Sequence, residues 1–512
     1  MAGGVAGWHH LRMSLPANID QLSADELRRL LVEQDRELNW RQVKIDKLTH
    51  EVAYYKRHYF GVKAERLPVE QGQLFEETLA ADMAAITEEL EQVSEPKPKG
   101  QAKRKPLPPE LPRTEIHHEP ESTTCACGCQ MKRIGEDVAE KLDYTPGIFT
   151  VERHIRGKWA CAQCETLVQA PVPAHVIDKG IPTTGLLAHV LIAKYLDHLP
   201  LYRQEGIFGR AGLPIPQSTL AEWVGQMGVT LQPLVDALKA EMLTYPVLHA
   251  DETPVAMLDP GAGKTHRAYL WSYSIGAFEP VKAVVYDFAD SRAGKHAREF
   301  LGEWRGTLVC DDYAGYKALI ADGVTEAGCM AHARRKFFDL HANNQSQLAQ
   351  QALATIQKLY QVEREVADLS PDERRRIRQE QAKPILDEFH DWLTRHRWQV
   401  PNGSSTAKAI DYSLKRWTAL AHYIGDAQVP IDNNWIENRI RPIATGRKNW
   451  LFAGSLRAGK RAAAIMSLIQ SAKLNGHDPF LYLKDILSRL PTQPNSRIGE
   501  LLPHRWLPEI SA

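Results

Sequence analysis

The longest regular pattern of apolar residues in the chain runs from residue 20 to residue 60. One apolar series keeps a strict spacing of seven residues and contains Leu31, Leu38, Ile45, Val52 and Tyr59. A second series, at Leu27, Leu48 and Tyr55, is interrupted by Gln34 and Arg41. Two such series are typical of a coiled-coil dimer, although one amphipathic helix packed on its own chain gives a similar pattern. We therefore predict a long helix over residues 20–60, with both partners left open.

Residues 61–113 predict a weaker, acidic helix from about residue 70 to residue 95, followed by a linker rich in proline and lysine. Proline blocks helix formation, and the charged side chains keep the segment solvated. The linker cations can contact phosphates, although a solvated hinge explains them equally well; they are Lys97, Lys99, Lys103, Arg104 and Lys105.

Residues 180–242 carry helical patterns only. A turn at Gly212-Leu-Pro-Ile-Pro precedes Ser218, which we expect to cap the next helix. This arrangement resembles the entry to the second helix of a helix-turn-helix, so the segment is predicted to be a helical DNA-binding domain.

The pattern changes at residue 243, where short apolar runs rich in β-branched and aromatic residues begin. The runs are 245–250, 268–275, 281–288, 307–310 and 324–329. The first three can form an antiparallel meander, and helices near 292–302 and 313–320 separate the others. This order predicts a mixed sheet flanked by helices. The core is expected to span 243–345 and 426–475, with a helical insertion at 346–425 and a C-terminal tail at 476–512.

Composition restricts the class of protein without identifying it. The 512 residues carry 63 basic and 63 acidic side chains, so any nucleic-acid surface must come from local segregation of charge. No apolar run approaches the ~18 residues of a membrane helix. The N-terminus has no signal-peptide pattern, and Met13 is an alternative start. We expect a cytoplasmic protein with no membrane partner.

Five of the seven cysteines are clustered, which indicates a metal site in a reducing compartment. Cys161 and Cys164 form a pair with the usual two-residue gap, about thirty residues after Cys125, Cys127 and Cys129. Two such pairs are the signature of one structural Zn²⁺ held by four thiolates. Either Cys127 or Cys129 can complete the set with Cys125. The predicted zinc-binding domain spans residues 114–175.

Three carboxylates stand in three different settings. Asp251 and Asp311 each end an apolar run, and Glu437 opens a basic helical stretch. Each alone is explained by a turn, a helix cap or the surface. Together they can bind two Mg²⁺ (or Mn²⁺) ions, which favour oxygen ligands and can clamp both oxygens of a phosphoryl transfer.

Basic and aromatic residues accompany these carboxylates, and they suit a polyanion with stackable bases. Some open a helix after His332, although a solvated helix face would look the same. The predicted DNA-binding residues are Arg334, Arg335, Arg439, Arg441, Arg447, Lys448, Trp450 and Lys460.

Several long segments match one family in its characteristic order. They are His-Ala-Asp251-Glu-Thr-Pro-Val, Asp311-Asp-Tyr-Ala-Gly-Tyr, Gly-Cys-Met-Ala-His332-Ala-Arg-Arg-Lys-Phe-Phe, Ile-Asp-Asn-Asn-Trp-Ile-Glu437-Asn-Arg-Ile-Arg-Pro, and, upstream, Phe60-Gly-Val-Lys-Ala-Glu-Arg-Leu and Arg133-Ile-Gly-Glu-Asp-Val-Ala-Glu-Lys-Leu-Asp-Tyr. From the coiled coil to about residue 490, the chain resembles transposases of the insertion-sequence-sixty-six family. This family belongs to the wider DDE (Asp-Asp-Glu) group with a ribonuclease-H-like core.

The resemblance implies a multidomain α+β protein with a coiled-coil helix, a small zinc ribbon, a helical DNA-binding domain and a ribonuclease-H-like α/β core with a helical insertion. It also implies that Asp251, Asp311 and Glu437 are catalytic, and the Gly after Cys127 favours that cysteine over Cys129. Two positions depart from the family pattern. Asp312 stands where Gly is common, which leaves open which carboxylate binds metal, and Met330 replaces Trp.

The function expected from this resemblance is a DNA transposase that cleaves element ends and joins the 3′ hydroxyls to target DNA. Its partners would be double-stranded DNA, further copies of the chain in at least a dimer, and small accessory proteins of the same element. A metal-dependent nuclease without strand transfer is one alternative. An inactive zinc-containing DNA-binding protein is another, although retention of all three carboxylates argues against it.

Overall fold

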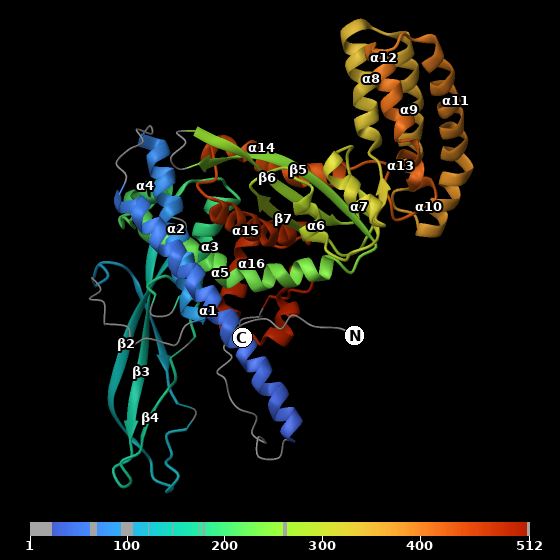
Figure 1. Ribbon diagram of the computed structural model, residues 1–512. Coiled ribbons are helices and arrows are strands. Elements are labelled where there is room, and N and C mark those ends of the chain that lie inside the picture. The colour runs from blue at the N-terminus through green and yellow to red at the C-terminus, as the bar shows by residue number, and fades with distance from the viewer. Residues whose placement is uncertain are drawn as a thin grey trace.

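The computed structural model describes most of the chain as a mixed α/β protein with projecting N-terminal, zinc-binding and helical parts (Figure 1). The described residues are 23–61, 69–93, 106–120, 122–145, 147–172, 174–177, 180–259 and 264–508. The linker cations at 97–105 lie outside this range. None of the helices within it is long and apolar enough to cross a membrane.

Two N-terminal helices, α1 (Ala24–Gly61) and α2 (Val69–Val93), form where the sequence predicts them. Part of α1 packs on its own chain, and the coiled-coil dimer stays a prediction for the rest. Leu48 is buried where α1 packs on α2, whereas the first half of α1 projects from the body (Figure 1). There Leu31 and Leu38 are 65% and 51% exposed. The first part of the seven-residue series therefore lies open to a partner.

The zinc-binding part is a four-stranded sheet. β2 (Lys132–Thr145) and β3 (Ile148–Ala160) form a long antiparallel hairpin that extends away from the body (Figure 1). β1 (Arg113–His118) pairs with β3 in parallel, and β4 (Leu167–Gln169) pairs with its end. This pairing brings the loop before β2 and the loop after β3 to the same end of the hairpin.

Three helices follow: α3 (Thr184–Tyr195), α4 (Leu201–Arg210) and α5 (Gln217–Met242). The predicted Ser218 cap is wrong, because Pro216 occupies the N-cap of α5 and no side chain bonds there. α5 packs against α2, α3, α4 and α15 (Leu456–Leu474), and it buries twelve of its residues. These buried residues serve the packing of α5, and its predicted role in reading DNA stays a prediction.

The central sheet has five strands in the order β7-β6-β5-β8-β9. β5 (Val247–Asp259), β6 (Lys264–Ile275) and β7 (Val284–Ala289) form the predicted antiparallel meander. β8 (Thr307–Val309) and β9 (Thr325–Ala327) then add in parallel on the other side of β5. The predicted helices between them are α6 (Lys295–Leu301) and α7 (Lys317–Ala321). All five predicted strands are therefore present, in a mixed sheet.

The predicted insertion is a helical bundle beside the sheet (Figure 1). It contains α9 (Gln347–Val366), α10 (Pro371–Ile377), α11 (Lys383–Gln399), α12 (Ser405–Lys415) and α13 (Trp417–Ala421). α8 (Met330–Asn344) packs in the same apolar cluster through Phe337 and Leu340. The packing unit thus begins at α8, before residue 346.

The chain returns to the sheet with α14 (Asn434–Trp450), α15 and α16 (Pro479–Arg489). A single apolar cluster contains side chains from α3, α5, the sheet, α15 and α16, and it ends with Trp506. The helical segment before the sheet and the predicted tail therefore share one apolar core with the sheet.

Buried charges fasten α2 to this core. Arg461 on α15 donates to Asp82 at 3.0 Å, and Asp82 is fully buried. Lys194 on α3 pairs with Glu77, which is also buried and accepts from the Leu201 N–H at 2.9 Å. Two of the acidic residues of α2, Glu77 and Asp82, thus form buried ion pairs with the core.

Candidate active site

Asp251 and Asp311 lie at equivalent positions on neighbouring parallel strands. β5 pairs with β8 only from Val247 to His249, and His249 stands opposite Val309. Two residues beyond that last pair lie Asp251 on β5 and Asp311 after β8. Asp251 was expected at a strand end, but β5 continues to Asp259 because β6 pairs with it throughout. The strand that ends near this point is β8, the parallel neighbour of β5. Its end leaves room beside the side chains of Asp251 and Asp311.

Two adjacent carboxylates, Asp311 and Asp312, have different partners. Asp311 accepts a hydrogen bond from the Tyr313 N–H at 3.0 Å through one carboxylate oxygen. Asp312 pairs with the buried guanidinium of Arg416 and lies 3.5 Å from the ammonium of Lys317. Arg416 also donates to Glu326 at 2.8 Å. Asp312 therefore ties the helical bundle to this loop, and Asp311 is the carboxylate left to face Asp251.

Glu437 lies in the first turn of α14, and a buried amide fixes the start of that helix. Asn433, the N-cap residue, donates to the Ala250 carbonyl at 2.9 Å, and its Oδ1 lies 2.7 Å from His249 Nδ1. Burial lowers the pKa of His249 to about 4, so its ring is neutral. Because the Asn433 amide nitrogen is used on Ala250, its oxygen accepts from His249 Nδ1–H. These two bonds hold α14 beside the residue that precedes Asp251.

Asp311 and Glu437 lie close enough to Asp251 for their charges to act on it. Burial raises the pKa of Asp251 well above its ordinary value, and the negative charges of Glu252, Asp311 and Glu437 raise it further. Such a concentration of carboxylates is unfavourable without cations. The donor set therefore fits hard divalent cations such as Mg²⁺, which prefer oxygen ligands.

The trio is too open for one ion. Among the described residues, it is not one of the groups whose ligand atoms all lie within 4.8 Å of one another. Two ions about 3.5–4 Å apart would need a wider spread of ligands than a single ion does. One Glu437 oxygen instead lies 3.8 Å from His332 Nδ1 on α8.

A fourth acidic side chain, Glu252, lies beside the trio and was not singled out from the sequence. Its buried carboxylate accepts from Arg292 Nε at 2.7 Å and from the Tyr316 hydroxyl at 2.8 Å. Arg292 also lies over the Tyr313 ring, 3.9 Å from its centroid. Glu252 is thus paired with Arg292, and it holds Arg292 at the margin of the site. Since the signal lies in contacts between β5 and later loops, only the fold reveals it.

Two of the predicted DNA-binding residues, Arg334 and Arg335, lie in a basic hollow between α8, α9 and the start of α14. The hollow has a volume of about 470 Å³ and is lined by Ala331, Arg334, Arg335, Phe338, Gln357, Tyr360, Arg364 and Asn434. Within the described chain, its three arginines form no ion pair with an acidic side chain. Phe338 is 49% exposed, and Arg334 lies over its ring. Arg364 and Phe338 were missed because the hollow joins two helices.

The remaining predicted DNA-binding residues divide into exposed and engaged side chains. Arg441, Lys448 and Lys460 are exposed. Arg447 donates to the Pro254 carbonyl at 2.6 Å, and Arg439 stacks on Trp435, 4.1 Å from its ring centroid.

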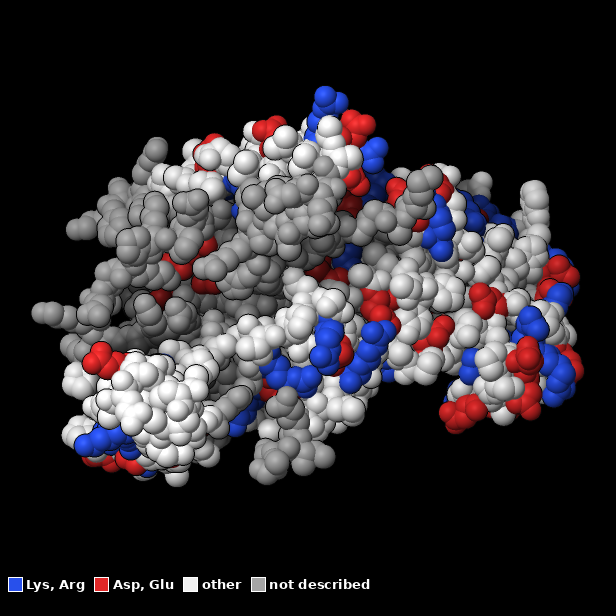
Figure 2. Space-filling model, turned by 90° about the horizontal axis from the view of Figure 1, so that it is seen from below, with Lys and Arg blue, Asp and Glu red and all other residues white. Residues whose placement is uncertain are grey.

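Trp450 packs against the main core and lines an interior cavity, so it is not an open stacking surface. On the face seen from below, basic and acidic side chains are mixed over the described surface (Figure 2).

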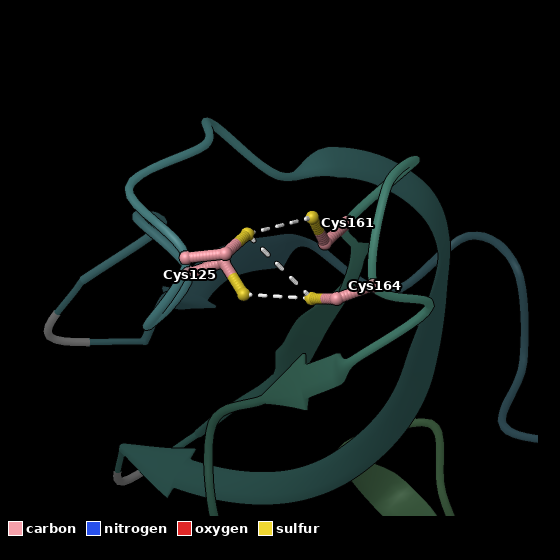
Figure 3. A group of neighbouring side chains, drawn as sticks. Cys125, Cys161 and Cys164 are labelled. Atoms are coloured by element: carbon pink, nitrogen blue, oxygen red, sulfur yellow. Dashed lines mark hydrogen bonds between the residues drawn. The ribbon is translucent and has the colours of Figure 1, made fainter.

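Four cysteines converge at the open end of the β2–β3 hairpin, where β2 begins and β3 ends (Figure 3). Cys125 Sγ lies 2.8 Å from Cys164 Sγ, and Cys127 Sγ lies 3.8 Å from the sulfurs of Cys161 and Cys164. Contacts with Cys125 and Thr166 lower the pKa of Cys164 to about 6, which favours a thiolate. Cys129 stands outside this group and donates to the Gln163 side chain at 2.8 Å. The arrangement supports a structural zinc site with Cys127 as the fourth ligand.

Comparison with known families covers most of the chain. Residues 179–461 match the Transposase IS66 family, and residues 467–504 match the IS66 C-terminal element. Residues 122–165 match the zinc-finger binding domain of transposase IS66, and residues 47–116 match a segment described as Transposase C of IS166 homeodomain.

Similar proteins occur in Sinorhizobium fredii. The uncharacterized protein y4hP is 34% identical over 493 residues, which cover 91% of this chain and 88% of that relative. The uncharacterized protein y4jD is 37% identical over 418 residues, covering 78% and 81% of the two chains.

We predict that Cys127→Ser abolishes stoichiometric zinc binding, whereas Cys129→Ser retains one zinc per chain. The reason is that Cys127 lies within the four-sulfur group and Cys129 bonds to Gln163. Metal analysis of the purified variants provides the measurement, with Cys161→Ser as the positive control for loss. Retention of zinc by Cys127→Ser together with its loss from Cys129→Ser would reverse the assignment.

We predict that Asn433→Ala lowers the free energy of unfolding by about 2–4 kcal/mol, because two buried partners lose their hydrogen bonds. The neighbouring Asn434 is exposed and bonds only to Asp432, so Asn434→Ala should change stability by about 0.5 kcal/mol or less. Urea unfolding of the two variants makes the comparison. We call the two hydrogen bonds of Asn433, to Ala250 and to His249, the clamp. Equal effects of the two variants would show that this clamp is not an important constraint.

Proposed function

The chain belongs to the IS66 transposase family, and on that premise we propose that it cleaves the ends of an insertion sequence and joins the 3′ hydroxyls to target DNA. The observation that supports this proposal most is the approach of Asp311, which follows β8, and Glu437, on α14, to Asp251 on β5, close enough for their charges to raise its pKa. The sheet order, with an antiparallel meander followed by two parallel strands, supports a ribonuclease-H-like core.

Asp251, Asp311 and Glu437 would hold two Mg²⁺ ions, which when bound activate the attacking oxygen and stabilise the leaving oxygen. In the first step, water attacks a phosphorus atom at the element end, and the bond to the 3′ oxygen breaks. That oxygen leaves as a 3′ hydroxyl. In the second step, this hydroxyl attacks a target phosphodiester, forms the new bond and releases a target 3′ hydroxyl. Each step exchanges one phosphorus–oxygen bond for another.

The basic hollow is suited to grip the strand being cut. It adjoins α14 through Asn434, one turn before Glu437, and it presents three arginines without acidic partners in the described chain. Phosphates neutralise such cations, and the exposed Phe338 ring can stack on a base. We assign Arg334, Arg335 and Arg364 to this contact, with Arg441, Lys448 and Lys460 as further exposed cations.

The exposed seam of α1 is suited to pair two copies of the chain. Leu31 and Leu38 belong to the seven-residue series and are the members that α2 leaves uncovered. Paired copies would bring two active sites to two element ends.

We expect Asp251→Ala, Asp311→Ala and Glu437→Ala each to reduce strand cleavage by about 10⁴-fold or more, the scale found when one member of a catalytic unit is removed. The assay supplies Mg²⁺ and DNA carrying the inverted repeats that flank the gene. It scores cleavage and strand transfer separately, which separates a transposase from a nuclease.

Asp312→Ala is the matched control, because Asp312 pairs with Arg416 and should not bind metal. It should retain more activity than Asp311→Ala. If the loss falls on Asp312→Ala and spares Asp311→Ala, the metal carboxylate is misassigned.

In the hollow, Arg335→Ala and Arg364→Ala should each weaken DNA binding and lower the slope of log affinity against log salt by about one unit. The measurement is fluorescence anisotropy with labelled duplex DNA at several salt concentrations. Arg395→Ala, an exposed arginine on α11 away from the hollow, should leave the slope unchanged. An equal decrease for all three would assign the effect to general charge.

Replacing both Leu31 and Leu38 by Glu should shift the oligomer to a monomer, because paired charges at a coiled-coil seam are unfavourable. Analytical ultracentrifugation measures the mass. Val43→Glu is the control, since Val43 is 68% exposed but lies outside the seven-residue series. A wild-type monomer at micromolar concentration would refute the dimer.

A further inference from the structure

Three unlike ligand atoms meet between the starts of α8 and α14. Cys329, His332 and Glu437 each offer one ligand atom, and these three atoms all lie within 4.8 Å of one another. Among the described residues, the only other group that meets this condition is the four-cysteine cluster. The convergence is fixed by the fold, because Cys329 and Glu437 are more than a hundred residues apart in the sequence.

Two of these ligand atoms have no other partner. His332 Nδ1 and Glu437 Oε1 are both buried and make no hydrogen bond, and they lie 3.8 Å from each other. Buried polar atoms without partners are costly, and in native proteins they often mark a missing ion or water. The atoms are therefore free to bind a ligand between them.

The third ligand atom is oriented by the backbone. The Asn433 N–H points at Cys329 Sγ from 3.2 Å, and the same residue forms the clamp that fixes α14. Hydrogen bonds from outside a metal site commonly orient its ligands. Cys329 is fully buried, so its sulfur is held in one direction.

We propose that Cys329, His332 and Glu437 form a second metal site, which binds a transition-metal ion of the Zn²⁺ or Co²⁺ class. Sulfur and imidazole ligands favour such ions over Mg²⁺, which prefers oxygen. Three protein ligands leave a fourth position open in a tetrahedral site. The site is distinct from the four-cysteine cluster at the hairpin end.

The consequence for catalysis rests on the proposed function. Glu437 is the one residue shared between this site and the carboxylate trio. A transition-metal ion bound to Cys329 and His332 would hold Glu437 away from Asp251 and Asp311. Zn²⁺ would therefore inhibit the Mg²⁺-dependent reaction by occupying a ligand that the reaction needs.

The direct test is a titration of Co²⁺ into full-length protein whose four-cysteine site already holds zinc. Co²⁺ bound to Cys329 gives a near-ultraviolet charge-transfer absorption from a single thiolate. We expect this absorption to saturate at one Co²⁺ per chain, and added Zn²⁺ should abolish it. Wild-type protein that develops no thiolate absorption would overturn the proposal without any variant.

Variants then identify the ligands. Cys329→Ser should abolish the thiolate absorption, and His332→Ala should weaken Co²⁺ binding by about 10-fold or more. Cys310→Ser is the matched control, because Cys310 is equally buried but lies outside the ligand group, so this variant should retain the signal. Zinc content and circular dichroism verify that each variant is folded. Absorption that survives Cys329→Ser would refute the site.

An activity assay then compares how strongly Zn²⁺ inhibits DNA cleavage by the wild type and by His332→Ala, at a fixed Mg²⁺ concentration. The Zn²⁺ concentration for half-inhibition should rise about 10-fold or more in His332→Ala relative to the wild type. Equal inhibition of both proteins would refute the competition. If the wild type cleaves no DNA, the proposed function fails, and the Co²⁺ titration still decides whether the metal site exists.

Discussion

The geometry of the candidate active site depends on one buried amide. Asn433 joins the start of α14 to β5 by bonding both the Ala250 carbonyl and the neutral ring of His249. A buried hydrogen bond contributes only about 1 kcal/mol net, but leaving its partners unmade costs more. The clamp is therefore less a source of stability than a restriction on where α14 can lie. This restriction also fixes the position of Glu437, which lies one turn along α14.

The helical bundle has a comparable connection to the other side of the site. Arg416 lies between α12 and α13 and reaches Asp312 and Glu326 beside the sheet. Because its guanidinium is buried, removing any one acidic partner would leave a charge incompletely compensated. The bundle thus cannot move freely relative to the loop that carries Asp311. The bundle also contributes α8 and α9 to the basic hollow, so a connection through Arg416 links this hollow with the loop that carries Asp311.

Much of the secondary structure was predictable because local patterns determine it. The five strands appear where the apolar runs predicted them, and the insertion is helical. The cysteine spacing also indicated a zinc site, since ligands to one ion must follow a narrow spacing. By contrast, the expected cap at Ser218 was wrong because α5 begins one residue earlier, at Gln217, with Pro216 as its N-cap residue.

The three candidate carboxylates were named from motifs, whereas the side chains that surround them were not. Glu252, Arg292 and Tyr316 come from separate elements, and only their packing reveals that the other two donate to Glu252. The basic hollow has the same origin, because Arg364 is an ordinary exposed arginine until α9 is placed beside α8. Sequence periodicity reports which face of a helix is buried, but it does not report which helix covers that face.

The burial of Asp82 has a consequence for the order in which the chain assembles during synthesis. Its partner Arg461 follows 379 residues later, whereas Lys194 follows Glu77 by 117. A buried carboxylate without its cation is strongly unfavourable. While the middle of the chain is still being synthesised, α2 therefore lacks Arg461, the cation that its buried Asp82 needs. The N-terminal arm closes onto the body only after nearly the whole polypeptide has emerged, so prematurely terminated chains should remain unassembled and be open to proteolysis.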